Sequence, residues 1–83
     1  MRRLSRDHVA LGEAIRAKRR ELGLSQTDLA ARCGLHRTYV ASVERGERNL
    51  GYANLLKIAA ALDLRGAALV RRAEARRRAG RRP

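Results

Sequence analysis

Residues 23–49 read GLSQTDLAARCGLHRTYVASVERGERN, and this stretch decides the fold of the 83-residue chain. Its apolar residues recur at helical spacing, with one more in the middle of the stretch: Leu29, Cys33, Leu35, Val40 and Val43. Gly34 stands where the first apolar series ends and the chain has to reverse, a place that favours a residue tolerating positive φ. The stretch therefore predicts two short helices joined by a tight turn, with Ala30 allowing them to approach closely.

The second of these helices is predicted to carry a polar and basic outward face. Between its apolar positions lie Arg37, Thr38, Ala41, Ser42 and Arg45. Two short helices around a glycine turn, the second with such a face, are the pattern of a helix-turn-helix whose second helix enters the major groove of DNA.

Of the two helices of this stretch, the first begins after Ser25 in the capping box Ser-Gln-Thr-Asp and the second covers residues 37–45. Further helices are predicted on both sides of it, over residues 7–21, 52–62 and 66–78. Gly23 and Gly46 end two of them. Three starts, at His36, Gly51 and Arg65, lack a strong capping side chain. The inward positions are predicted to be Leu11, Ile15, Lys18 and Leu22 in the first helix, Leu55, Ile58, Ala59 and Leu62 in the fourth, and Ala67, Val70 and Glu74 in the fifth.

Composition favours one compact all-α domain. Apolar residues make up 45% of the chain, with two Tyr and no Phe or Trp, which suits close-packed short helices. The expected organisation is an N-terminal arm (1–6), a helix-turn-helix domain (7–70), and the end of helix five with an Arg-rich tail (71–83). The lone Cys33 is read as a buried, inert thiol.

The net charge of +12 predicts a polyanionic partner, and nucleic acid is the commonest one. Residues 71–83 carry seven Arg and one Glu, so half of the excess lies there. Whether this tail attracts phosphates or is only a solvated helix end stays open, as does a purely solubilising role for the charge. Neither a signal peptide nor a membrane-spanning run is predicted, and the expected location is the cytoplasm, on the nucleoid.

Residues 11–64 resemble the lambda-repressor-like, or Xre-type, helix-turn-helix family. The resemblance is carried by Leu11-Gly12, Ile15-Arg16, Gly-Leu-Ser-Gln at 23–26, Leu29-Ala30, Gly34 and Glu44-Arg45-Gly46. The runs Arg37-Thr38-Tyr39-Val40, Val43-Glu44-Arg45 and Arg48-Asn49-Leu50 look most like the controller proteins of restriction–modification systems. The resemblance implies a compact five-helix domain, with the helix-turn-helix in helices two and three, that regulates transcription as a homodimer on a palindromic operator.

The resemblance also implies roles for single residues. Base contacts fall to Arg37, Thr38 and Ser42, and arginine can donate two hydrogen bonds to the O6 and N7 of guanine. Contacts to the DNA backbone fall to Ser25, Gln26, Tyr39, Arg45, Arg48 and Asn49. Arg19 and Glu44 match a buried ion pair that ties helix one to helix three, with a solvated surface pair as the alternative. Separately, apolar residues beyond the needs of a small core predict the dimer interface: Leu56, Leu64, Leu69 and Val70.

Other classes of function fit the sequence less well. An antitoxin or phage-type repressor acting mainly on a protein partner is the leading alternative, but the tail lacks the apolar anchors needed to wrap a toxin. Nonspecific RNA or chromosomal binding is disfavoured because few aromatic residues are present to stack on bases. Catalysis is not predicted, since the eight acidic residues are scattered and no nucleophile–base pair or metal-ligand cluster occurs. No cofactor, metal or small-molecule ligand is expected.

Overall fold

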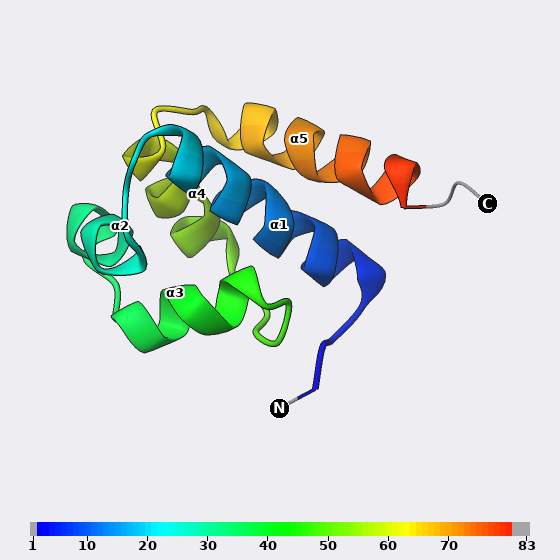
Figure 1. Cartoon of the computed structure of the whole chain (residues 1–83), viewed down its shortest axis with the longest axis horizontal. Coiled ribbons are helices and arrows are strands. Elements are labelled where there is room, and N and C mark those ends of the chain that lie inside the picture. Colours follow the sequence, from blue (N-terminus) through cyan, green and yellow to red (C-terminus); the bar gives the residue numbers. More distant parts are fainter. Residues whose placement is uncertain (1, 81–83) are drawn as a thin grey trace.

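The computed structural model describes residues 2–80, and every regular element in that range is helical (Figure 1). The helices are α1 (Arg6–Glu21), α2 (Gln26–Cys33), α3 (Arg37–Glu44), α4 (Tyr52–Ala61) and α5 (Gly66–Ala79). The predicted all-α class, the number of helices in this range and the helix-turn-helix in helices two and three are confirmed, with helix ends that differ from the predicted ones by at most one residue. Met1 and residues 81–83, including the tail residues Arg81 and Arg82, lie outside the described range.

Helix α1 is the centre of the arrangement. It packs along α5 on one side and against α3 on the other, and α4 closes the core by contacting α2 and α5 (Figure 1). The largest fully buried side chains come from all five helices: Ile15, Leu29, Val40, Ile58, Leu62 and Leu69. The core is therefore built from aliphatic side chains, as the composition predicts.

The local signals around α2 form as predicted. Ser25 Oγ accepts a hydrogen bond from the Asp28 amide at 3.0 Å, and the Ser25 amide donates to Asp28 Oδ2 at 2.9 Å. This capping box holds the pKa of Asp28 below its usual range, because the Ser25 amide favours the charged carboxylate. Gly34 ends α2 in the left-handed conformation, with φ 68°. A start signal that sequence reading missed is Ser5, whose Oγ caps α1 by accepting from the His8 amide at 3.2 Å.

The prediction for the inner face of helix five is wrong. Leu69 and Ala73 are its buried residues, whereas Ala67, Val70 and Glu74 are exposed. The reason is that α5 lies along α1 and buries the i, i+4 pair that faces α1, which rotates Val70 and Glu74 to the side. Leu69 is 0% exposed within a single copy of the chain, so its predicted place in a dimer interface is also wrong.

Cys33 lies in the core, where its Sγ donates to the Leu29 carbonyl oxygen at 3.1 Å. Burial raises the pKa of the Cys33 thiol, which disfavours the reactive thiolate. The reading of Cys33 as an inert buried thiol agrees with this environment.

No helix among residues 2–80 is both long enough and apolar enough to cross a membrane.

Gly12 allows α1 to approach the end of α3. A Cβ at this buried position would lie 2.8 Å from the Glu44 carbonyl carbon and would also overlap the Val43 carbonyl oxygen. Because the obstacle is backbone, it cannot move aside as a side chain can. We expect Gly12→Ala to lower the free energy of unfolding by about 1–3 kcal/mol in urea denaturation. Gly80→Ala is the control, since its Cβ would meet its neighbours at 3.6 Å, and an equal loss there would contradict this explanation.

Candidate nucleic-acid interface

The start of α3 presents two exposed polar side chains to solvent. Arg37 and Thr38 open the helix, and neither takes part in a side-chain hydrogen bond or ion pair with another described residue. His36 precedes them as an N-cap whose side chain forms no capping hydrogen bond. The guanidinium of Arg37 and the hydroxyl of Thr38 are thus free to contact a ligand that approaches the exposed side of α3.

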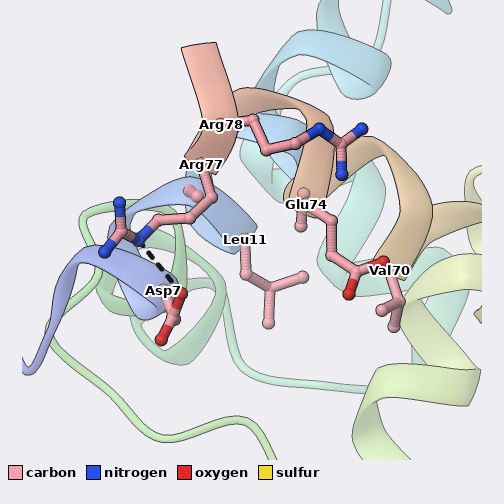
Figure 2. A pocket seen from close by; sticks show the side chains of 8 residues that line it. Asp7, Leu11, Val70, Glu74, Arg77 and Arg78 are labelled. Atoms are coloured by element: carbon pink, nitrogen blue, oxygen red, sulfur yellow. Dashed lines mark hydrogen bonds and ion pairs between the residues drawn. The ribbon is translucent and has the colours of Figure 1, made fainter. Parts of the chain in front are cut away.

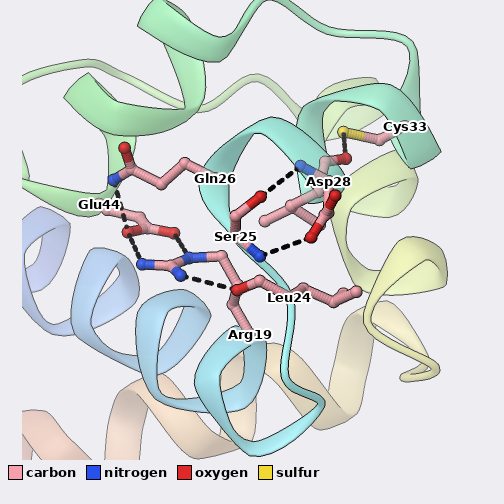
Figure 3. A network of polar contacts seen from close by, with 8 residues as sticks. Arg19, Leu24, Ser25, Gln26, Asp28, Cys33 and Glu44 are labelled. Carbon is pink, nitrogen blue, oxygen red and sulfur yellow. Dashed lines mark hydrogen bonds and ion pairs between the residues drawn. The ribbon is translucent and has the colours of Figure 1, made fainter.

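A buried ion pair fixes α3 to α1 behind this surface. Arg19 Nε donates to Glu44 Oε2 at 2.7 Å and Arg19 Nη2 to Glu44 Oε1 at 3.0 Å, while Nη1 reaches the Leu24 carbonyl oxygen at 2.9 Å (Figure 3). The Arg19 and Glu44 side chains are 10% and 2% exposed, so the pair is shielded from solvent. The hydrogen bonds to Glu44 raise the pKa of Arg19. The structure thus brings these two predicted residues together as a two-pronged pair between α1 and α3.

Gln26 extends this network from the first residue of α2. Its Nε2 donates to Glu44 Oε1 at 3.0 Å (Figure 3). One amide N–H of Gln26 remains for a further acceptor. Ser25 and Gln26 therefore lie together at the start of α2, while Gln26 and Glu44 connect α2 with the end of α3.

Helix α3 and the loop after it carry three further residues predicted to contact the DNA backbone. The Arg48 guanidinium lies 5.3 Å from the centre of the Tyr39 ring, and the Tyr39 hydroxyl accepts from Asn54 Nδ2 at 3.2 Å. Arg45 is exposed and its Nε donates to Glu47 Oε1 at 3.0 Å. Tyr39, Arg45 and Arg48 are thus held in place by neighbours, with Arg45 and Arg48 open to solvent.

The N-terminal arm is tied to the same loop through contacts that sequence reading missed. The Leu4 amide donates to the Gly46 carbonyl oxygen at 2.8 Å. His8 Nε2 lies 3.3 Å from Asn49 Oδ1, and its Nδ1 lies 2.6 Å from Ser5 Oγ. The pattern fits an imidazole protonated on Nε2, which donates to Asn49 and accepts from Ser5. The contacts from Leu4 to Gly46 and from His8 to Asn49 join positions more than 40 residues apart, so no local sequence motif predicts them.

The predicted outward orientation of Ala41 and Ser42 is wrong. Both are buried, at 9% and 4% exposure, and Ser42 Oγ donates to the Tyr39 carbonyl oxygen at 2.8 Å. This inward hydrogen bond satisfies the hydroxyl within the helix, so Ser42 does not lie on the exposed face beside Arg37 and Thr38. The base contact predicted for Ser42 therefore has no structural basis.

The two helices α2 and α3, the glycine turn and the exposed start of α3 define a protein of the helix-turn-helix class. The chain belongs to the helix-turn-helix family, whose family model matches residues 15–69. Its likeness to the Xre-type branch and to restriction–modification controllers, expected from the motifs, is confirmed by the relatives.

Three proteins illustrate this likeness. Control protein C.SmaI of Serratia marcescens is 49% identical over 53 residues, which is 64% of this chain and 63% of C.SmaI, so the chain spans less than two thirds of that relative. The restriction–modification controller C.AhdI of Aeromonas hydrophila is 48% identical, with a TM-score of 0.74 over 76% of this chain and 96% of that one. Controller C.Esp1396I, solved as a tetramer with its natural 35 base-pair operator, is 28% identical, with a TM-score of 0.82 over 89% and 97% of the two chains.

Proposed function

We propose that this protein is a sequence-specific regulator of transcription that binds duplex DNA through the start of α3. The observation that carries the proposal is the pair Arg37 and Thr38, exposed on a helix that the buried Arg19–Glu44 pair holds against α1. The fixed position of α3 against α1 matters because side chains can read bases only when they are held in a defined position relative to the DNA. Membership of the helix-turn-helix family and the operator-bound controller C.Esp1396I support the same conclusion.

Backbone contacts from Ser25, Gln26, Tyr39, Arg45, Arg48 and Asn49 are part of the proposal. Gln26 has a free N–H, and Arg45 and Arg48 are exposed cations beside α3. Contacts of this kind to phosphate set the position of a protein on DNA without reading its sequence. Likeness to C.SmaI, C.AhdI and C.Esp1396I further suggests control of a restriction–modification operon.

The experiment for this proposal is a selection of binding sites from a pool of random duplexes with the purified protein. We expect enrichment of a two-fold symmetric site whose half-sites lie about one helical turn apart, since a dimer would place two α3 helices on one side of the duplex. Recovery of unrelated sequences after repeated rounds would contradict sequence-specific binding.

Arg37→Ala tests base readout at a single position. We expect a loss of about 1–3 kcal/mol in binding free energy on the selected duplex, and relaxed preference at one G·C pair in each half-site. Fluorescence anisotropy with duplexes that vary at that pair measures both effects. Lys57→Ala removes an exposed cation on α4 and serves as the control. Equal loss on selected and random duplexes would mean that Arg37 contacts phosphate only.

Pairing of two copies is proposed through the face between α4 and α5. Tyr52, Leu56 and Val70 are exposed at 76%, 39% and 38%, and they are three of the four large apolar side chains exposed among residues 2–80. All three line one hollow of about 520 Å³, together with Arg71 and Glu74. Leu64, also predicted for the interface, is half-buried and packs against the core, so Leu56 and Val70 carry this part of the proposal.

The apolar face continues past Val70 toward α1. Val70 and Glu74 also line a neighbouring hollow with Leu11, bounded by the Asp7–Arg77 ion pair at 3.1 Å (Figure 2). A surface with an apolar centre and both signs of charge at its edge can pair with itself about a two-fold axis. A second copy of the chain is therefore the proposed occupant of this face.

The second candidate function is that of an antitoxin or phage-type repressor that acts mainly on a protein partner. An immunity repressor of a Bacillus phage is 36% identical over 62 residues, which leaves a repressor role outside restriction–modification open. A methyltransferase and an endonuclease encoded beside the gene would favour the controller role, whereas a small toxin frame would favour the antitoxin. We do not propose an enzymatic activity for this chain, and its proposed location is the bacterial cytoplasm, on the nucleoid.

A further inference from the structure

Four arginines from three segments gather on the solvent side of α1. Arg3 of the N-terminal arm, Arg6 and Arg16 of α1, and Arg76 of α5 are exposed, and none of them takes part in an ion pair among residues 2–80. We call these four residues the α1 basic strip. Three neighbouring cations are paired instead: Arg19 with Glu44, Lys18 with Glu21 and Arg77 with Asp7.

Two hollows connect the α1 basic strip with the proposed DNA-binding surface. The first, of about 310 Å³, is lined by Arg3 and Arg16 together with Gln26 and Arg45. The second, of about 360 Å³, is lined by Arg3, Arg6 and Arg76. Arg3 lines both hollows, so basic side chains extend from the start of α2 and the end of α3 across α1 to α5, with the carboxylate of Glu13 among them.

From these positions we infer that the α1 basic strip binds phosphates of the same duplex, next to the phosphates within reach of Gln26 and Arg45. This inference rests on the proposed function. Ten residues of helix separate Arg6 from Arg16, which is about 15 Å along α1 and matches the axial rise of four to five nucleotides. Arginine is suited to this task because its planar fork can hold two phosphate oxygens at once.

One acidic residue, Glu13, lies among the arginines of the strip. Its removal should change the affinity for DNA in the opposite direction to the removal of an arginine. Glu13 lines both hollows, is exposed, and forms no ion pair with another described residue. A carboxylate there would repel approaching phosphates. Its neutralisation should therefore strengthen binding, a change that loss of protein stability could not imitate.

The experiment compares three purified variants on the selected duplex and on a random duplex over a range of salt concentrations. Arg3→Gln/Arg16→Gln removes two cations of the strip, and Lys57→Gln/Arg65→Gln removes two exposed cations elsewhere, so their net charges are equal. The strip variant should bind both duplexes more weakly by the same factor. Its log–log salt slope should fall by about 0.9 for each phosphate that is no longer bound, or about 3.6 for two phosphates in each of two protomers. Glu13→Gln should raise the affinity for both duplexes.

Equal slopes for the strip variant and its charge-matched control would overturn the inference, because only net charge would then matter. So would a Glu13→Gln variant that binds neither duplex more tightly than the wild-type protein. Failure of the proposed function is distinguishable, since the wild-type protein would then show no preference for any duplex sequence.

Discussion

Replacing Glu44 by alanine is expected to lower the free energy of unfolding by about 3–5 kcal/mol, because it leaves the buried Arg19 guanidinium without its partner. Arg19 would keep only its hydrogen bond to the Leu24 carbonyl oxygen, and Gln26 would lose its acceptor. Urea denaturation followed by circular dichroism measures the loss. Glu47→Ala is the control, because the arginine it leaves without a partner, Arg45, is 56% exposed and stays solvated, whereas Arg19 is 10% exposed; this variant should change stability by about 0–1 kcal/mol.

A double variant separates the cost of an orphaned charge from the value of the pair. Arg19→Met/Glu44→Leu replaces both charged groups with apolar side chains, so it should be more stable than either single replacement of these residues by alanine. If Glu44→Ala lowered the free energy of unfolding no more than Glu47→Ala, Arg19 and Glu44 would be a solvated pair. Another interaction would then have to hold α3 against α1.

Substitutions of the neighbouring residues Leu69 and Val70 are expected to affect different properties, namely the stability of one copy of the chain and the pairing of two copies. Leu69 is fully buried in one copy of the chain, so Leu69→Ala should lower the free energy of unfolding by about 2–5 kcal/mol. Val70 is 38% exposed on the proposed pairing face. Val70→Asp should leave helix content largely intact and shift the protein from dimer to monomer in sedimentation at micromolar concentration. A wild-type monomer at high micromolar concentration would contradict the proposed pairing face.

Short-range signals were sufficient for the helices and their ends. The Ser25 capping box and the left-handed Gly34 each depend on residues adjacent in sequence, and both occur as predicted. The side that α5 buries could not be predicted in the same way. Its sequence alternates alanine and arginine so closely that the choice of Leu69 and Ala73 depends on where α1 lies.

In the candidate site, too, the features that depend on local sequence could be predicted and those that depend on packing between helices could not. Arg37 and Thr38 are exposed at the start of α3, as the spacing of apolar residues predicts, whereas Ser42 turns inward to the Tyr39 carbonyl oxygen. The contacts of His8 with Asn49 and the proximity of Arg3 to Arg45 join segments about 40 residues apart. The spacing of residues within each helix does not predict such contacts, because they depend on how α1 and α3 pack against each other.

Sequence-specific recognition of duplex DNA is tested most directly by the ratio of two affinities. The dissociation constants for the selected duplex and for a scrambled duplex of equal length and composition should be measured together at several salt concentrations. We expect the selected duplex to bind at least about 1,000-fold more tightly near physiological salt, and a large preference to remain as the salt concentration rises. A ratio near one at every salt concentration would contradict the proposed function, and would make the protein a nonspecific polyanion binder.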